Sequence, residues 1–218
     1  MSTKSRPLRA DAERNRRLLL DAARELFAER GLHVSLDDVA KRAGVGVGTA
    51  YRRFSSRSEL IEALFDERLD QMVALAEGCL EIEDPWTGLV AFIERTAELQ
   101  TSDRGLKEIL LGSAEGQEKI KEVRERMRPL GERLVRRAQE AGALRPDFAP
   151  QDLPMIQIML GAISDAAQSV EPGIWRRYLA LILIGLRAEP EPAPLGAEPL
   201  GWEGMANVLS CWRPPRRD

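Results

Sequence analysis

Residues 35–57 read SLDDVAKRAGVGVGTAYRRFSSR, in which two short helical segments are separated by a run rich in glycine. Ser35 has the character of an N-cap, and Asp38 follows it at the spacing that starts helices. Residues 36–43 keep one apolar face until a glycine ends the segment, and residues 49–54 are long enough for one further short helix. The pattern predicts a helix, a turn and a second helix.

Longer amphipathic segments lie on both sides of this pair. Upstream, residues 14–30 repeat apolar side chains at the three- and four-residue spacing of a helix. Downstream, a capping box over residues 56–59 starts a long helix over residues 58–80. Two short helices joined by a glycine-containing turn and held by scaffold helices form a helix-turn-helix. We therefore predict a DNA-binding domain over residues 14–57.

The two sides of the second short helix differ in chemistry. Ala50 and Phe54, four residues apart, share one face and are expected to dock on the scaffold. The opposite face is polar and cationic, as a surface that reads base edges must be. This face is expected to present Thr49, Tyr51, Arg52 and Arg53.

Charge is divided unevenly along the 218 residues. Residues 1–57 hold 13 Lys and Arg against 7 Asp and Glu, a net charge of +6, so the remainder must carry −9 for the whole chain to total −3. A basic head attracts phosphate, whereas an acidic body repels it. We therefore expect double-stranded DNA to bind at the N-terminal end only.

The rest of the chain is also helical in pattern, and no alternating β-branched run indicates a strand. Residues 1–13 are expected to form a flexible basic arm, and residues 58–188 a second domain. Residues 189–218 are rich in proline and are expected to form a disordered tail. The predicted fold class is therefore all-α, a three-helix helix-turn-helix module joined by the helix over residues 58–80 to an all-helical C-terminal domain.

A family resemblance covers residues 18–64, which read LLLDAARELFAERGLHVSLDDVAKRAGVGVGTAYRRFSSRSELIEAL. The landmarks that carry it, in order and without gaps, are Ala22, Ala23, Leu26, Phe27, Gly31, Val39, Ala40, Ala43, Gly44, Val45, Gly48, Thr49, Tyr51, Phe54 and Arg57. This stretch resembles the DNA-binding signature of the TetR (tetracycline-repressor) family. The resemblance implies that phosphates are held by Ser35, Tyr51, Arg53 and Arg57. It also implies that the side chains nearest the bases are Val47, Thr49 and Arg52.

The resemblance further implies how the C-terminal domain works. Residues 151–170 and 172–188 are expected to form two helices that pair with a second copy in a homodimer, in agreement with their high apolar content. A largely apolar small-molecule effector is expected to release the repressor from a pseudo-palindromic operator. Candidate pocket residues, chosen from the apolar excess of this domain and its polar neighbours, are Trp86, Leu89, Phe92, Ile93, Thr96, Ile109, Met127, Met155, Gln157, Met159, Ile163 and Ser164.

Other classes of protein fit less well. His33 is the only histidine, and Cys79 and Cys211 lack metal-site spacing, so we expect no enzyme, no metal and no cofactor. No apolar stretch is long enough to span a membrane and no secretory leader pattern is present, so a cytoplasmic protein is expected. One alternative stays open, an architectural protein that binds DNA without an effector and with little sequence preference.

Overall fold

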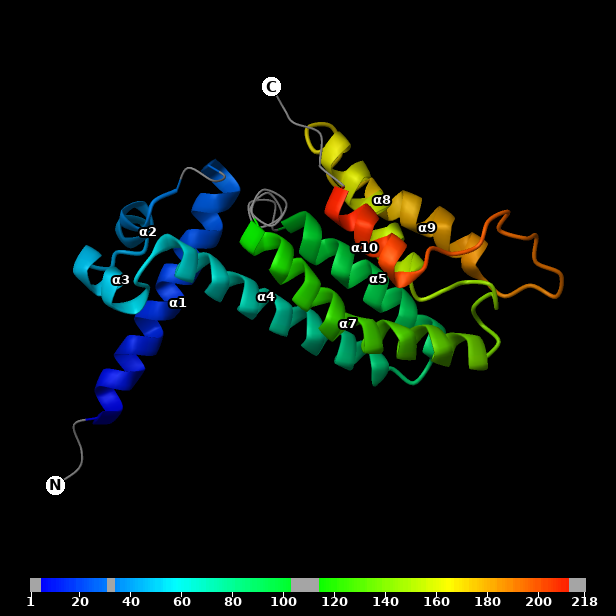
Figure 1. Cartoon of the computed structure of the whole chain (residues 1–218), viewed down its shortest axis with the longest axis horizontal. Helices are drawn as coiled ribbons and strands as arrows, with labels where there is room; N and C mark the ends of the chain where they lie inside the picture. The colour runs from blue at the N-terminus through cyan, green and yellow to red at the C-terminus, as the bar shows by residue number, and fades with distance from the viewer. Residues whose placement is uncertain (1–4, 31–33, 103–113, 212–218) are drawn as a thin grey trace. The chain divides into compact units, whose positions relative to one another are not determined.

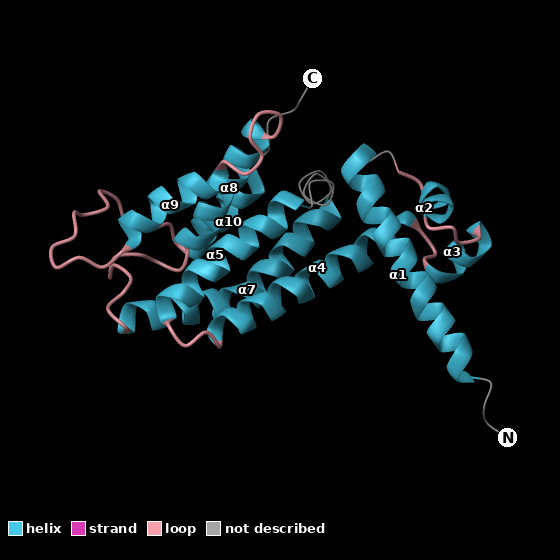
Figure 2. Cartoon of the chain, turned by 180° about the vertical axis from the view of Figure 1, so that it is seen from behind, coloured by secondary structure: helices cyan, strands magenta, loops and turns pink. Residues whose placement is uncertain are grey.

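The computed structural model describes residues 5–30, 34–102 and 114–211. Within these ranges, every element longer than a single bridge is a helix, as the predicted all-α class requires. Figure 2 shows helices and connecting loops only in the described part of the chain. The described residues divide into two compact units, one ending at Asp70 and the other beginning at Gln71.

The N-terminal unit contains α1 (Ser5–Arg30), α2 (Leu36–Arg42), α3 (Val47–Arg53) and the part of α4 (Arg57–Leu80) up to Asp70 (Figure 1). Helix α1 packs on α2 and α3, and α2 packs on α3. The apolar faces of these helices close over one core, which removes their side chains from water. The buried members are Leu19, Leu20, Ala22, Ala23, Leu26, Phe27, Val34, Leu36, Val39, Ala40, Ala50, Phe54, Leu60, Leu64 and Phe65.

The first turns of α4 belong to this N-terminal unit. Leu60 and Leu64 lie one turn apart on α4, and both are buried with Phe65 in the same core as α1–α3. The expected domain boundary at residues 57/58 therefore differs from the observed division after Asp70. The physical reason is that the short helices α2 and α3 need the apolar face of α4 to complete their core.

Helix α1 begins at Ser5, so residues 5–13, which the sequence pattern assigned to a flexible arm, are helical. Pro7 lies in the first turn, where its missing N–H has no intrahelical partner to lose. Residues 8–13 read LRADAE and contain Ala, Leu, Arg and Glu, which are strong helix formers. The part of the expected arm over residues 1–4 lies outside the described residues.

The second unit contains the rest of α4, α5 (Pro85–Ser102), α7 (Ala114–Glu140), α8 (Asp152–Ala167), α9 (Trp175–Leu186) and α10 (Trp202–Cys211). Helix α5 packs against α7, α8 and α9, which makes it the central helix of this unit (Figure 1). The Asp84 carboxylate caps the start of α5 by accepting from the Thr87 N–H at 2.9 Å.

Arg145 joins three parts of the second unit. Its guanidinium donates to both carboxylate oxygens of Asp147 at 2.6 and 2.9 Å, to the Gly185 carbonyl at 3.1 Å and to the Ala193 carbonyl at 2.5 Å. A buried guanidinium is tolerated only when its donors are paired in this way. Arg145 therefore ties the loop between α7 and α8 to the end of α9 and to the chain beyond it.

The segment after residue 188 contains a helix, although the sequence favoured disorder over residues 189–218. Helix α10 covers Trp202–Cys211, and its Met205 is only 1% exposed. The Arg128 guanidinium of α7 lies 4.5 Å from the centre of the Trp202 ring, a cation–π contact. Composition hid this element, because the proline-rich run before Trp202 dominates the tail while the apolar residues that bury α10 are few.

We expect Met205→Ala to lower the free energy of unfolding by about 2–5 kcal/mol, because it deletes a buried side chain that the surroundings cannot replace. Denaturant unfolding followed by circular dichroism measures this change. Val208→Ala on the same helix is the control, since Val208 is exposed, and we expect a change within about 0.5 kcal/mol. Equal effects of the two substitutions would mean that α10 does not dock through Met205.

Candidate DNA-binding surface

Ser35 starts α2 through a reciprocal capping box. The Asp38 N–H donates to Ser35 Oγ at 3.1 Å, and the Ser35 N–H donates to Asp38 Oδ2 at 3.0 Å. The Ser35 hydroxyl also donates to Asp38 Oδ2 at 2.6 Å. These bonds lower the pKa of Asp38. Ser35 thus defines where α2 begins, in addition to the phosphate contact that the family resemblance implies for it.

The turn between α2 and α3 depends on Gly44. Its φ of +65° lies in the left-handed region, which residues with a Cβ rarely adopt. The Val45 N–H then donates to the Ala40 carbonyl at 3.0 Å, and the Thr49 N–H donates to the Gly46 carbonyl at 2.8 Å. Gly44 therefore reverses the chain at the end of α2 so that α3 can return to the core.

Helix α3 has a buried side and an open side, as its sequence predicts. Ala50 is 0% exposed and Phe54 is 2% exposed, both within the N-terminal core. The Arg16 guanidinium lies 6.0 Å from the centre of the Phe54 ring. On the other side, Val47 and Tyr51 are 44% and 49% exposed. The predicted inward anchors are confirmed.

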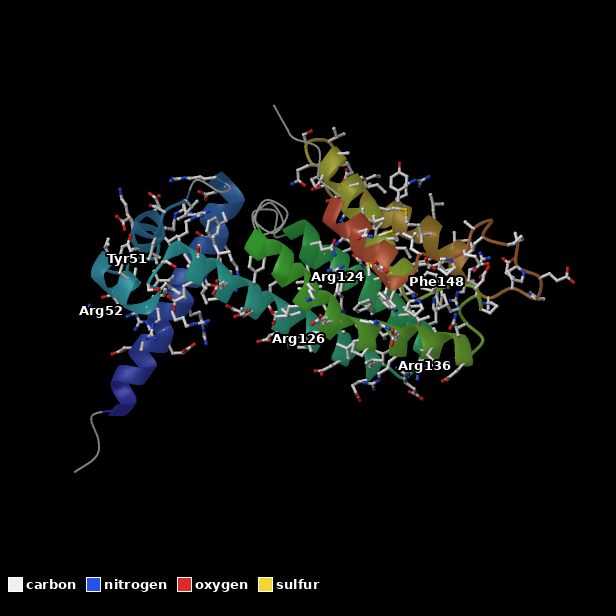
Figure 3. All side chains as sticks on the ribbon, viewed as in Figure 1. Tyr51, Arg52, Arg124, Arg126, Arg136 and Phe148 are labelled. Atoms are coloured by element: carbon white, nitrogen blue, oxygen red, sulfur yellow. The ribbon has the colours of Figure 1, made fainter. Side chains whose placement is uncertain are left out.

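Two side chains on the open side of α3 interact with polar neighbours. Hydrogen bonding with the Asp37 carboxylate raises the pKa of Tyr51. Arg52 donates from Nη2 to Thr49 Oγ1 at 3.2 Å. Both side chains are exposed, and Figure 3 labels them on α3. Arg52 is thus partly ordered before any contact with DNA.

Arg57 has a partner within the protein. Its Nε donates to the Val34 carbonyl at 2.9 Å, and its guanidinium carbon lies 5.7 Å from the centre of the Phe27 ring. These contacts join the start of α4 to α1 and to the residue before Ser35. Arg57 is half-buried and has a structural role that the sequence did not reveal.

Arg42, at the end of α2, is neutralised by two carboxylates of α1. It donates to Glu29 at 3.0 and 2.7 Å and to Glu25 at 3.1 Å, which raises the pKa of Arg42 and lowers that of Glu29. A cation paired with carboxylates in this way adds little to the positive electrostatic potential that attracts phosphate. The basic character of the open side of α3 therefore comes mainly from Arg52 and Arg53.

A second group of polar side chains is buried in the other unit, between α5 and α8. Gln157 of α8 donates from Nε2 to the Ile93 carbonyl at 3.0 Å and to Thr96 Oγ1 at 2.7 Å. Ser164, two turns further along α8, is also buried. Three polar residues predicted from the sequence are thus in the interior of this unit.

Most of the apolar residues predicted for the pocket are buried or half-buried in the same unit as Gln157. Trp86, Leu89, Phe92 and Ile93 are buried, and Met127, Met155 and Ile163 are half-buried. Met159 is placed differently, since it is 46% exposed. It follows Gln157 by two residues, a rotation of about 200° around a helix, so it cannot share the inner face. Ile109 lies outside the described residues.

No group of His, Cys, Asp and Glu suited to a metal ion exists among the residues that the structure places. Over the same residues, every helix is too short or too polar to cross a bilayer.

Known proteins resemble both units. Residues 19–64 match the family described as "Bacterial regulatory proteins, tetR family", and residues 84–188 match "Transcriptional regulator SbtR-like, C-terminal domain". A TetR transcription regulatory protein from Mycobacterium vanbaalenii shares 30% identity with a TM-score of 0.65, over 83% of this chain and 99% of that one. This chain belongs to the TetR family.

Two further relatives support membership of the TetR family. A TetR transcriptional regulator from Streptomyces coelicolor shares 30% identity with a TM-score of 0.60, and the match covers 79% of this chain and 98% of that one. An HTH-type transcriptional regulator of Staphylococcus aureus is 38% identical over 89 residues, 39% of this chain. That match spans 46% of the relative's own length, less than half.

In this TetR-family chain we expect Gly44→Ala to lower the free energy of unfolding of the N-terminal unit by about 1–2 kcal/mol, because Ala at positive φ is strained. The matched control is Gly48→Ala. Gly48 lies within α3 at ordinary helical φ, and a Cβ there would meet no atom within 4 Å. Gly48→Ala should raise the free energy of unfolding by up to about 1 kcal/mol, because alanine favours a helix more than glycine does. Thermal unfolding of both variants measures these changes. Loss of stability in Gly48→Ala but not in Gly44→Ala would contradict the role given to Gly44.

Proposed function

We propose that this chain is a sequence-specific DNA-binding repressor that acts as a homodimer and is released from its operator by a small molecule. The observation that carries the proposal is the two-sided α3, with Ala50 and Phe54 buried and a cationic side open. A helix of this kind fits the major groove, where each base pair presents a distinct pattern of donors and acceptors.

The roles proposed for single residues follow from their positions. Val47 and Thr49 lie at the start of α3, the part of a recognition helix that enters the groove, and are assigned to the bases. Arg52, in the last turn of α3, is assigned to the bases because a guanidinium can pair with guanine in two places. Tyr51 and Arg53 of the same helix, together with Ser35 and Arg57 outside it, are assigned to phosphates. Phosphate contacts set the register of the protein on the duplex, whereas base contacts select the sequence.

The proposed dimer uses the outer faces of α8 and α9. Large apolar side chains exposed on these helices are Met159, Tyr178, Leu181 and Ile184. Contiguous exposed apolar surface marks an interaction site. A second copy covering the same face would form an isologous interface. In the proposed complex the two α3 helices of the dimer lie about 34 Å apart, one turn of DNA. The operator is then a pseudo-palindrome.

Release by an effector is the proposed means of regulation. The ligand would bind in the second unit, near the buried polar group of Gln157 and Thr96, and favour a state in which the two α3 helices no longer match the operator. Helix α4 is one continuous element that contributes to both units, so it is the proposed path of coupling. A coupling free energy of about 1–3 kcal/mol is sufficient for a useful switch.

The alternative, an architectural protein without an effector, predicts similar affinity for all duplexes. A repressor prefers its operator by about 10³ or more over other sequences. Selection of bound sites from random duplex DNA, followed by competition at physiological salt, distinguishes the two. Binding without preference would reject the repressor.

We expect Arg52→Ala to relax selection at one base pair by about 1–3 kcal/mol, because a bidentate contact to guanine is lost. Arg53→Ala should instead weaken binding to all sequences and reduce the salt slope by about 1. Arg136→Ala is the charge-matched control, since Arg136 is exposed on α7 in the other unit (Figure 3). Binding titrations at several salt concentrations measure all three, and equal losses with unchanged selectivity would refute these assignments.

We expect Leu181→Asp to weaken the dimer by about 100-fold or more, because each copy would bury an unpaired carboxylate. Analytical ultracentrifugation measures the association, and operator affinity should fall with it. Leu195→Asp is the control, since Leu195 is also exposed but lies beyond α9. A dimer that tolerates Leu181→Asp would place the interface elsewhere.

A further inference from the structure

Gln157 is a buried amide in an apolar surrounding. It is 8% exposed, on the face of α8 that packs against α5. Its neighbours Ile156 and Leu160 on α8 and Ile93 on α5 belong to the hydrophobic core of this unit. Burying an amide there costs free energy unless each of its polar atoms has a partner.

The orientation of this amide is fixed by α5. Gln157 Nε2 donates to the Ile93 carbonyl at 3.0 Å, and a carbonyl can only accept. It also donates to Thr96 Oγ1 at 2.7 Å, while the Thr96 hydroxyl donates to the Phe92 carbonyl at 2.6 Å. Turning the amide over would set its oxygen against the Ile93 carbonyl oxygen. The nitrogen therefore faces α5 and the oxygen faces away from these partners.

The other end of the same amide is unsatisfied. Gln157 Oε1 is buried and accepts no hydrogen bond within the described part of the chain. Thr96 cannot supply one, because its hydroxyl proton is directed to Phe92. A native core rarely leaves such an acceptor unpaired, so this atom points to a group that binds there.

Small residues lie beside the amide on α8. Gly161 and Ser164 follow Gln157 by four and seven residues, the spacing that places all three on one helical face, and both are buried. This face therefore offers little side-chain bulk beside the amide, and it carries one further hydroxyl, that of Ser164, two turns along α8. Phe92 and Ile93 supply apolar surface from α5.

Charge limits what can bind at this place. Arg145, the one buried cation among the described residues, is paired with Asp147 and with two backbone carbonyls. An ionised carboxylate entering the core would find no free buried counterion there and would lose its hydration. A cation would likewise find no buried carboxylate among the described residues. The binding group is therefore neutral, and it donates a hydrogen bond to an amide oxygen.

We infer that Gln157 Oε1 accepts a hydrogen bond from the effector, and that the effector is a neutral, largely apolar molecule with a hydroxyl or N–H group. The inference rests on the proposed ligand-released repressor and adds the chemical class of its ligand. Thr96 acts as a positioning residue, because its hydroxyl holds the Gln157 nitrogen and so directs the oxygen.

The test uses matched probes and the full-length dimer. β-Naphthol, octylphenol and decanol are each compared with their methyl ether and with a carboxylate of the same skeleton, by calorimetry. We expect the hydroxyl compound of at least one set to bind about 10-fold more tightly than its ether, the difference that one hydrogen bond makes. Gln157→Leu and Gln157→Met should each bring this ratio to about 1 while ether binding persists.

Gln168→Leu is the matched control, because Gln168 is exposed at the end of the same helix. It should leave the ratio unchanged. The inference is overturned if no probe binds, if hydroxyl and ether bind equally to the unmodified protein, if the preference survives in both Gln157 variants, or if a carboxylate binds most tightly. Operator binding is measured in parallel, so failure of the repressor function appears there and not in the probe ratio.

Discussion

The docking of Ala50 and Phe54 on the N-terminal core is the contact on which the candidate DNA surface depends. A seven-residue helix such as α3 is not stable in isolation, because helix nucleation is costly. Burial of these two side chains supplies the missing stability and fixes which side of α3 is open. The positive φ of Gly44 lets α3 reach that core at the correct angle.

Arginine residues have different tasks in the N-terminal unit although they look alike in sequence. Arg42 is neutralised by two glutamates of α1, and Arg57 holds the Val34 carbonyl. Arg52, on the open side of α3, makes one exposed hydrogen bond, to Thr49. The basic composition of this region therefore combines structural cations with cations that can meet phosphate or base edges. Membership of the TetR family indicates that this unit binds DNA. The contacts within the protein then distinguish the structural arginines from those available to DNA.

The second unit combines an apolar core with a buried polar contact. A core that served stability alone would be expected to contain apolar side chains at positions 96 and 157, because an unpaired buried acceptor is costly. Gln157, Thr96 and Ser164 occupy that interior instead. Departures from the most stable choice tend to gather at functional sites. The body of the protein thus combines an exposed apolar face on α8 and α9 with a specific polar group inside.

The sequence by itself determined the all-α class, the helix-turn-helix and the inward face of α3, since helical periodicity, caps and glycines act over a few residues. Only the tertiary structure decided which arginines are paired, where α4 changes from one core to the other, and that Met159 faces outward whereas Gln157 is buried. It also revealed α10, where Met205 is buried within a tail of disordered composition. These features depend on partners distant in the chain, and local pattern does not contain that information.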